Sequence, residues 1–104
     1  MIDLARLSSK ELLPGFEGKM IHTEKMTLAY WDISAGCQLP EHHHHHEQVV
    51  NVLSGKFELT LDGKKHLLSE GNVLVIPSNV PHSGKSITDC RILDVFSPVR
   101  EDYK

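Results

Sequence analysis

Short apolar runs separated by turn residues are the feature of this sequence that most limits its fold. From Lys19 onward, runs rich in β-branched and aromatic residues recur at near-regular spacing, over residues 20–22, 26–33, 49–53, 56–61, 65–68, 73–76 and 90–96. Asp62-Gly63 is a strong hairpin signal between two of these runs, and Ser54-Gly55 is a weaker one. Many short strands joined in this way predict an all-β sandwich or barrel.

The length of 104 residues is that of one ordinary domain. We therefore expect a single domain over residues 1–104, with its core from about residue 19 to about residue 100. Residues 1–18 are then a short N-terminal extension. Within it, residues 3–13 are expected to form a short helix or turn that ends at Pro14-Gly15.

Charge and composition exclude several classes of function. The formal net charge is −3, and no Lys- or Arg-rich face is visible, which argues against nucleic-acid binding. No apolar stretch is long enough for a signal peptide or a transmembrane span, so no membrane partner is expected. Two cysteines are too few for a disulfide framework, which favours a cytoplasmic protein with reduced thiols.

Five consecutive histidines, residues 42–46, lie near the middle of the chain and lead into an apolar run. A purification tag lies at a terminus, so this run is interpreted as native sequence. On a strand, residues i and i+2 share a face, so His42 and His44 can converge on one metal ion. His43 and His45 then point to solvent, while His46 has the right parity and its role stays open.

Two further residues complete the candidate metal site. Gln48 has the parity of His42 and His44 and lies where a loop changes into a strand, and His82 lies in a later turn. The alternative is a solvated histidine loop without a metal. His22 and His66 are expected to be ordinary polar surface residues.

The spacing of these residues resembles the two motifs of the cupin family. The first motif is carried by Gly36, His42, His44, Gln48 and Gly55, and the second by Gly71, Pro77 and His82. Cupins usually carry Glu at the position of Gln48, and Asn79 and Ser86 replace the Gly and Asn of the second motif. The resemblance implies a double-stranded β-helix, which is a jelly-roll barrel.

Nearly the whole chain is similar to the bacterial cupins that degrade pectin and unsaturated uronates. That resemblance assigns the metal ligands to His42, His44, Gln48 and His82. It places the functional residues of a D-x-F-x-x-x-R segment at Asp94, Phe96 and Arg100. It also implies a homodimer and one divalent ion, Ni, Mn, Fe, Co or Zn, since imidazole ligands do not select among these metals.

The residues of the D-x-F-x-x-x-R segment also carry information of their own. Asp94 lies in the middle of an apolar strand, where a carboxylate is costly to bury unless it is paired or part of a site. Arg100 could hold a carboxylate with two hydrogen bonds, or simply face solvent. Phe96 is expected in the core or lining the pocket, and so is Tyr30.

These features predict a metal-dependent enzyme that converts 4,5-unsaturated uronates into linear ketouronates by ring opening and tautomerisation. Its partner is then a small uronate held by the metal and Arg100, with Asp94 moving a proton. Two alternatives stay open at this point. One is an iron-dependent dioxygenase, and the other is a non-catalytic cupin that binds a sugar or an anion.

Overall fold

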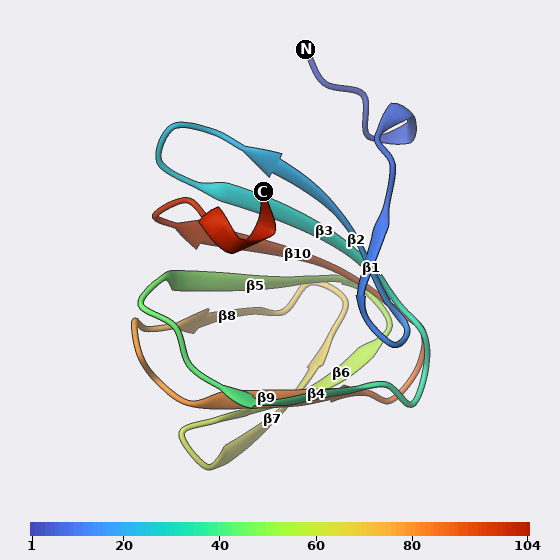
Figure 1. Ribbon diagram of the computed structural model, residues 1–104. Helices are drawn as coiled ribbons and strands as arrows, with labels where there is room; N and C mark the ends of the chain where they lie inside the picture. Colours follow the sequence, from blue (N-terminus) through green and yellow to red (C-terminus); the bar gives the residue numbers. More distant parts are fainter.

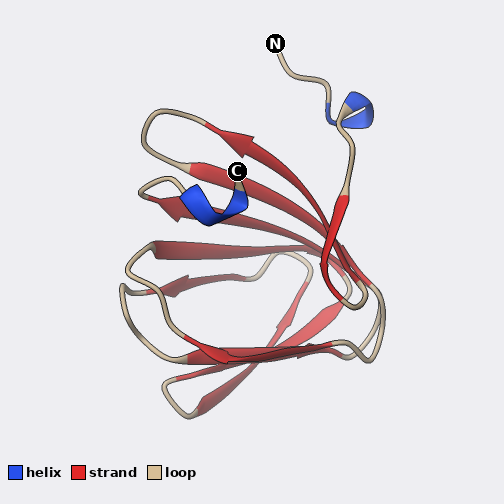
Figure 2. Ribbon diagram, viewed as in Figure 1, coloured by secondary structure: helices blue, strands red, loops and turns tan.

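Ten strands and two single-turn 3₁₀ helices make up the computed structural model, which describes residues 1–104 (Figures 1 and 2). The strands are β1 (Lys10–Leu13), β2 (Phe16–His22), β3 (Thr27–Ile33), β4 (Gln38–His42), β5 (Glu47–Ser54), β6 (Lys56–Leu61), β7 (Lys64–Ser69), β8 (Val73–Ile76), β9 (His82–Ser86) and β10 (Cys90–Ser97). The helices are η1 (Leu4–Arg6) and η2 (Glu101–Tyr103). The predicted all-β class is confirmed. No helix is long and apolar enough to cross a membrane.

The strands form two antiparallel sheets that lie one above the other in Figure 1. The six-stranded sheet has the order β1-β2-β3-β10-β5-β8, and the four-stranded sheet has the order β4-β9-β6-β7. From β3 onward the chain crosses repeatedly between the sheets, which is the connectivity of a jelly roll. The predicted double-stranded β-helix is therefore confirmed.

The core lies between the sheets because alternate residues of each strand point inward. On β3, Thr27, Ala29, Trp31 and Ile33 are buried, while the residues between them are half-buried or exposed. Tyr30 therefore lies on the outer face of the sheet. Tyr30 was expected in the core or in the pocket wall, and both expectations were wrong. Trp31, and not Tyr30, faces the interior.

The N-terminal part of the chain differs from the prediction. Leu4–Arg6 is a short helix, but Lys10–Leu13 is a strand that pairs with β2 through a turn at Gly15. Gly15 has φ +79°, a conformation that glycine adopts without steric cost, so the chain reverses here and continues the sheet. The six-stranded sheet thus begins before residue 19.

Strands β4 and β9 were not predicted, since their sequences QLPEH and HSGKS are polar and contain Pro or Gly. They form because they pair with each other, and β9 also pairs with β6. Glycine at position 84 is required by packing: a Cβ atom there would lie 2.4 Å from the Phe57 ring. These two strands position the histidines of the site.

Candidate active site

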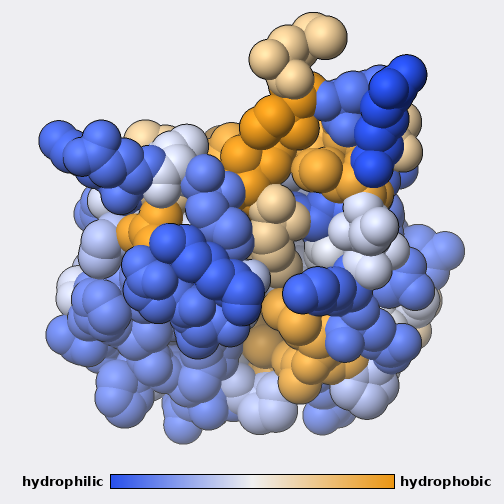
Figure 3. Space-filling view, turned by 45° about the horizontal axis from the view of Figure 1, so that its top comes forward, coloured by the Kyte–Doolittle hydropathy of each residue, from blue (hydrophilic) through white to orange (hydrophobic).

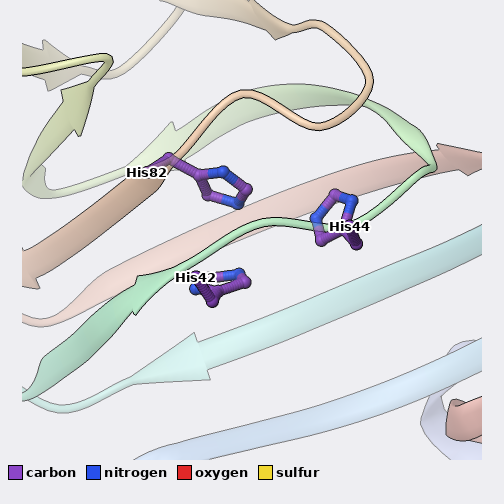
Figure 4. A group of neighbouring side chains, drawn as sticks. All are labelled: His42, His44 and His82. Atoms are coloured by element: carbon purple, nitrogen blue, oxygen red, sulfur yellow. The ribbon is translucent and has the colours of Figure 1, made fainter.

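Three histidines from two strands and a loop converge inside the barrel. His42 ends β4, His82 begins β9, and the two residues are opposite each other in the sheet register. His44 lies in the loop that follows β4, so its position does not come from strand alternation, as the sequence had suggested. Candidate ligand atoms of the three residues all lie within 4.8 Å of one another, and Figure 4 shows the rings gathered around a common centre.

Backbone carbonyl groups fix the orientation of all three rings. The Nδ1 atom of His42 donates to the Pro40 carbonyl (2.8 Å), that of His82 to the Val80 carbonyl (2.9 Å), and that of His44 to the His46 carbonyl (3.0 Å). A carbonyl oxygen only accepts hydrogen bonds, so each Nδ1 carries the proton. Each Nε2 atom is therefore left with a free lone pair, as in a metal-binding histidine.

The surroundings of the Nε2 atoms test whether this site fits a metal ion. His82 Nε2 is buried and has no hydrogen-bond partner. His44 Nε2 lies 3.1 Å from Gln48 Oε1, so two atoms that both carry lone pairs face each other. Two ligands that are each about 2.1 Å from one ion, at roughly a right angle, lie about 3 Å apart. The three histidines and Gln48 thus fit a divalent cation.

Burial favours the neutral form of two of these histidines, His44 and His82. Burial and the positive charge of Arg100 lower the pKa of His44 to about 4. Burial also lowers the pKa of His82, against the opposing effect of its hydrogen bond to the Val80 carbonyl. Neutral imidazole is the form that binds a metal, so the site is ready to bind one at neutral pH.

A cavity of about 220 Å³ opens next to the histidines, between the two sheets. Most of its lining is apolar, and its polar groups come from His42, Gln48, His82, Asp94 and Arg100. Figure 3 shows a band of hydrophobic residues between hydrophilic ones on the face that carries the N-terminal end. An apolar cavity with a few convergent polar groups is typical of a small-molecule site.

Asp94 is buried in this cavity and has no ion-pair partner, so it is neither exposed at the rim nor salt-bridged. Trp31 Nε1 donates a hydrogen bond of 3.0 Å to Asp94 Oδ2, whereas Oδ1 has no partner. Burial raises the pKa of Asp94 to about 6, although Gln48, Trp31 and the charge of Arg100 act in the opposite direction. Such a carboxyl group can both give and take a proton near neutral pH.

Arg100 is also buried and does not face solvent. Its guanidinium carbon lies 4.7 Å from the centre of the Phe96 ring and 4.0 Å from that of the Tyr103 ring. Its backbone N–H donates to the Thr27 hydroxyl (2.9 Å), and its side chain is paired with Asp102. Phe96 fulfils both expectations, because it is buried in the core and also lines the cavity.

Histidines 43 and 45 are exposed, as predicted, but His46 is buried. His46 Nε2 donates to the Val99 carbonyl at 3.2 Å, and its Nδ1 atom has no partner. His46 is therefore not grouped with the three converging rings. It links the histidine loop to the segment that carries Arg100.

Sequence reasoning missed three residues around the site: Trp31, Asp102 and Tyr103. The choice between Tyr30 and Trp31 depended on which face of β3 is buried, and both faces carry apolar residues. Asp102 and Tyr103 lie in the C-terminal turn η2, whose contact with Arg100 leaves no periodic pattern in the sequence. His22 was expected at the surface, but it is half-buried and hydrogen-bonded to Thr27 (2.9 Å).

Comparison with known proteins agrees with this fold. Residues 29–96 match the cupin domain family. The chain therefore belongs to the cupin family, and within it resembles the cupins of pectin degradation.

Two of its relatives are named KdgF. The structure of KdgF from Halomonas sp. is 30% identical, with a TM-score of 0.89, and the match covers 93% of this chain and 91% of that protein. The pectin degradation protein KdgF of Dickeya dadantii is 34% identical over 65 residues, which are 62% of this chain. That match spans only 59% of the Dickeya protein.

A further match covers only a short part of the chain. Quercetin 2,3-dioxygenase of Bacillus subtilis is 56% identical over 32 residues, but these cover 31% of this chain and 10% of that enzyme. The similarity is therefore confined to a short segment.

Proposed function

We propose that this protein is a metal-dependent enzyme that converts 4,5-unsaturated uronates into linear ketouronates by ring opening and tautomerisation. One observation carries the proposal: two of the three converging histidines, His42 and His82, line the same cavity as the Asp94 carboxyl group and the Arg100 guanidinium group. The similarity to two KdgF proteins supports a role in pectin breakdown.

The residues that would bind the ion are His42, His44 and His82 through Nε2, and Gln48 through Oε1. A divalent ion bound there supplies Lewis acidity toward a substrate oxygen. None of these four ligands carries a negative charge, so the site favours an anionic substrate. A uronate meets this condition through its carboxylate.

Three other residues act on the substrate itself. Arg100 binds the substrate carboxylate, which suits a buried guanidinium with free N–H groups. Asp94 moves a proton through Oδ1, because Oδ2 is engaged by Trp31. Phe96 lines the cavity beside both groups and excludes water from the reacting centre.

Ultraviolet absorbance of a 4,5-unsaturated galacturonate tests the proposal, because the conjugated double bond disappears during the reaction. Metal-loaded protein is expected to accelerate the decay far above the spontaneous rate, and a chelator or His82→Ala is expected to abolish the acceleration. If none of Ni, Mn, Co, Fe or Zn gives acceleration, the substrate assignment is wrong.

A second candidate is an iron-dependent dioxygenase, favoured by the local match to quercetin 2,3-dioxygenase. Oxygen uptake separates the two candidates. Uptake that requires both Fe(II) and an aromatic substrate such as a flavonol would favour the dioxygenase, whereas uronate ring opening consumes no oxygen.

We also propose that the partner of this chain is a second copy of itself, bound through the outer face of the six-stranded sheet. One cross-strand row on that face is entirely apolar and consists of Ile21, Leu28, Val95, Val49 and Val75. Val73 and Val75 on this face are 59% and 50% exposed. Solvated faces of antiparallel sheets are normally polar.

The size and charge of this outer face suit a self-complementary dimer. Five strands spaced about 4.8 Å apart and roughly 24 Å long give a face of roughly 600 Å² before side-chain relief is counted. A stable interface buries about 800 Å² on each partner. At the rim, Arg91 pairs with Asp32, so charges of both signs are present, which is compatible with a self-complementary two-fold interface.

A further inference from the structure

The guanidinium of Arg100 is held by Asp102 along one edge only. Arg100 Nε donates to Asp102 Oδ1 at 3.0 Å, and Arg100 Nη2 donates to Asp102 Oδ2 at 2.8 Å. The Arg100 side chain is 9% exposed, whereas the Asp102 side chain is 60% exposed. Asp102 therefore approaches the buried guanidinium from the solvent side.

The opposite edge of the same guanidinium has no partner. Arg100 Nη1 makes no hydrogen bond, and one N–H of Nη2 is also free, because a guanidinium has five N–H groups and Asp102 uses two. Arg100 lines the cavity. The guanidinium carbon also lies over the rings of Phe96 and Tyr103, so both rings pack against this group.

We infer that Asp102 is a positioning residue: it fixes the Nε–Nη2 edge of Arg100 so that the Nη1–Nη2 edge binds the carboxylate of the uronate. The inference rests on the proposed function. Asp102 also compensates the buried positive charge in the absence of substrate. The carboxylates of Asp102 and of the ligand bind different edges, so they do not compete.

Two variants with the same change of charge test this inference. Asp102→Asn keeps the shape of the side chain but loses the charge and one of the two acceptor oxygens. Glu101→Gln, at an exposed neighbour that contacts Lys104 and not Arg100, is the matched control. Calorimetry on the metal-loaded protein measures the binding of D-galacturonate and of D-galactose, which lacks the carboxylate.

Asp102→Asn is expected to weaken D-galacturonate binding about tenfold and to leave D-galactose binding unchanged, because one charge-assisted contact of Arg100 is lost. With the unsaturated uronate, KM is expected to rise while kcat changes little. A merely structural role would lower both ligand affinities together and would also lower the melting temperature. Glu101→Gln is expected to behave as the wild type.

Tighter D-galacturonate binding by Asp102→Asn would show that Asp102 competes for the guanidinium, and unchanged binding would show that Asp102 does not position it; both overturn the inference. The proposed function is tested separately by turnover. If the wild type opens no unsaturated uronate but Asp102→Asn still loses carboxylate selectivity, the proposed reaction fails and the positioning role stands.

Discussion

Asp94 differs from every other carboxylate of the chain, because it is buried without an ion-pair partner and keeps one oxygen free of hydrogen bonds. Asp94→Asn retains the shape of the side chain and its contact with Trp31 but cannot transfer a proton. We expect kcat for uronate ring opening to fall about 100-fold or more. Metal content, measured by elemental analysis, is expected to be unchanged, and a fully active variant would remove Asp94 from the mechanism.

His46 is the histidine whose role the sequence left open, and its contacts make it a link between two segments. His46→Leu leaves the buried Val99 carbonyl without a donor, which costs about 1–3 kcal/mol of stability and frees the segment that carries Arg100. We expect a lower melting temperature and a higher KM. His46→Gln can still donate to Val99 and is expected to be milder.

The metal content of the variants distinguishes the role of His46 as a link between two segments from a role as a metal ligand. Both His46 variants are expected to retain the metal with unchanged stoichiometry. The ring of His44 is oriented by a hydrogen bond to the backbone carbonyl of residue 46, and neither variant changes that carbonyl. Loss of the ion from His46→Gln would instead make His46 a ligand.

Cys90 gives the stability of the protein a dependence on alkaline pH. Burial raises the pKa of the Cys90 thiol in the folded state. Below about pH 8.5 the thiol is protonated in both the folded and the unfolded chain, and Cys90 makes its full contribution to the free energy of unfolding. As the pH rises above that value the unfolded chain loses the thiol proton more readily than the folded chain, so this contribution is lost. Chemical denaturation at several pH values is expected to show a shallower alkaline loss for Cys90→Ala than for the wild type.

At the scale of elements, the strands that sequence analysis recovered are those with strong β-propensity. The β6–β7 hairpin was predicted from Asp62-Gly63, and both residues have positive φ (48° and 79°), as a tight two-residue turn requires. Strands β4 and β9 could not be predicted, because their pairing is decided by neighbours distant in the sequence and not by their own polar residues.

The same distinction applies to the site. Spacing and family resemblance indicated His42, His44, Gln48 and His82. This was possible because the spacing of motif residues along the sequence can be recognised without knowing the local conformation. The hydrogen bonds that orient the rings come from backbone carbonyls, to which every residue type contributes equally. Sequence patterns carry no information about such contacts.

Gly84 shows how a polar strand depends on packing. Gly84→Ala would place a methyl group against the Phe57 ring and the Glu58 carbonyl, so we expect a loss of about 1–3 kcal/mol in the free energy of unfolding. Ser83→Ala, on the same strand, is the control and is expected to change stability little. If Gly84→Ala is as stable as Ser83→Ala, β9 can shift to make room for the methyl group, and the packing against Phe57 does not require glycine.

At the scale of the whole molecule, the apolar outer face is expected to decide the oligomeric state. Val75→Lys places a charge in the apolar row of the proposed interface, at its end on the edge strand β8, where burying the charge without a partner is costly. Light scattering after size-exclusion chromatography is expected to report a dimer for the wild type and a monomer for this variant.

Leu67→Lys is the matched control for the dimer, because Leu67 is also an exposed apolar residue (63%) but lies on β7 in the other sheet. It is expected to remain dimeric. A wild-type monomer at micromolar concentration would contradict the proposed interface, and so would a dimer that survives Val75→Lys.

The hydrogen bond between Trp31 and Asp94 has a practical consequence, because Trp31 is the only tryptophan of the chain. Its indole ring lines the cavity, with the rings of Phe16 and Tyr103 edge-on at 6.3 and 6.2 Å. The intrinsic fluorescence of the protein therefore originates at the site itself. Emission wavelength and quenching can follow the arrival of a ligand or the ionisation of Asp94 in real time, without any added dye.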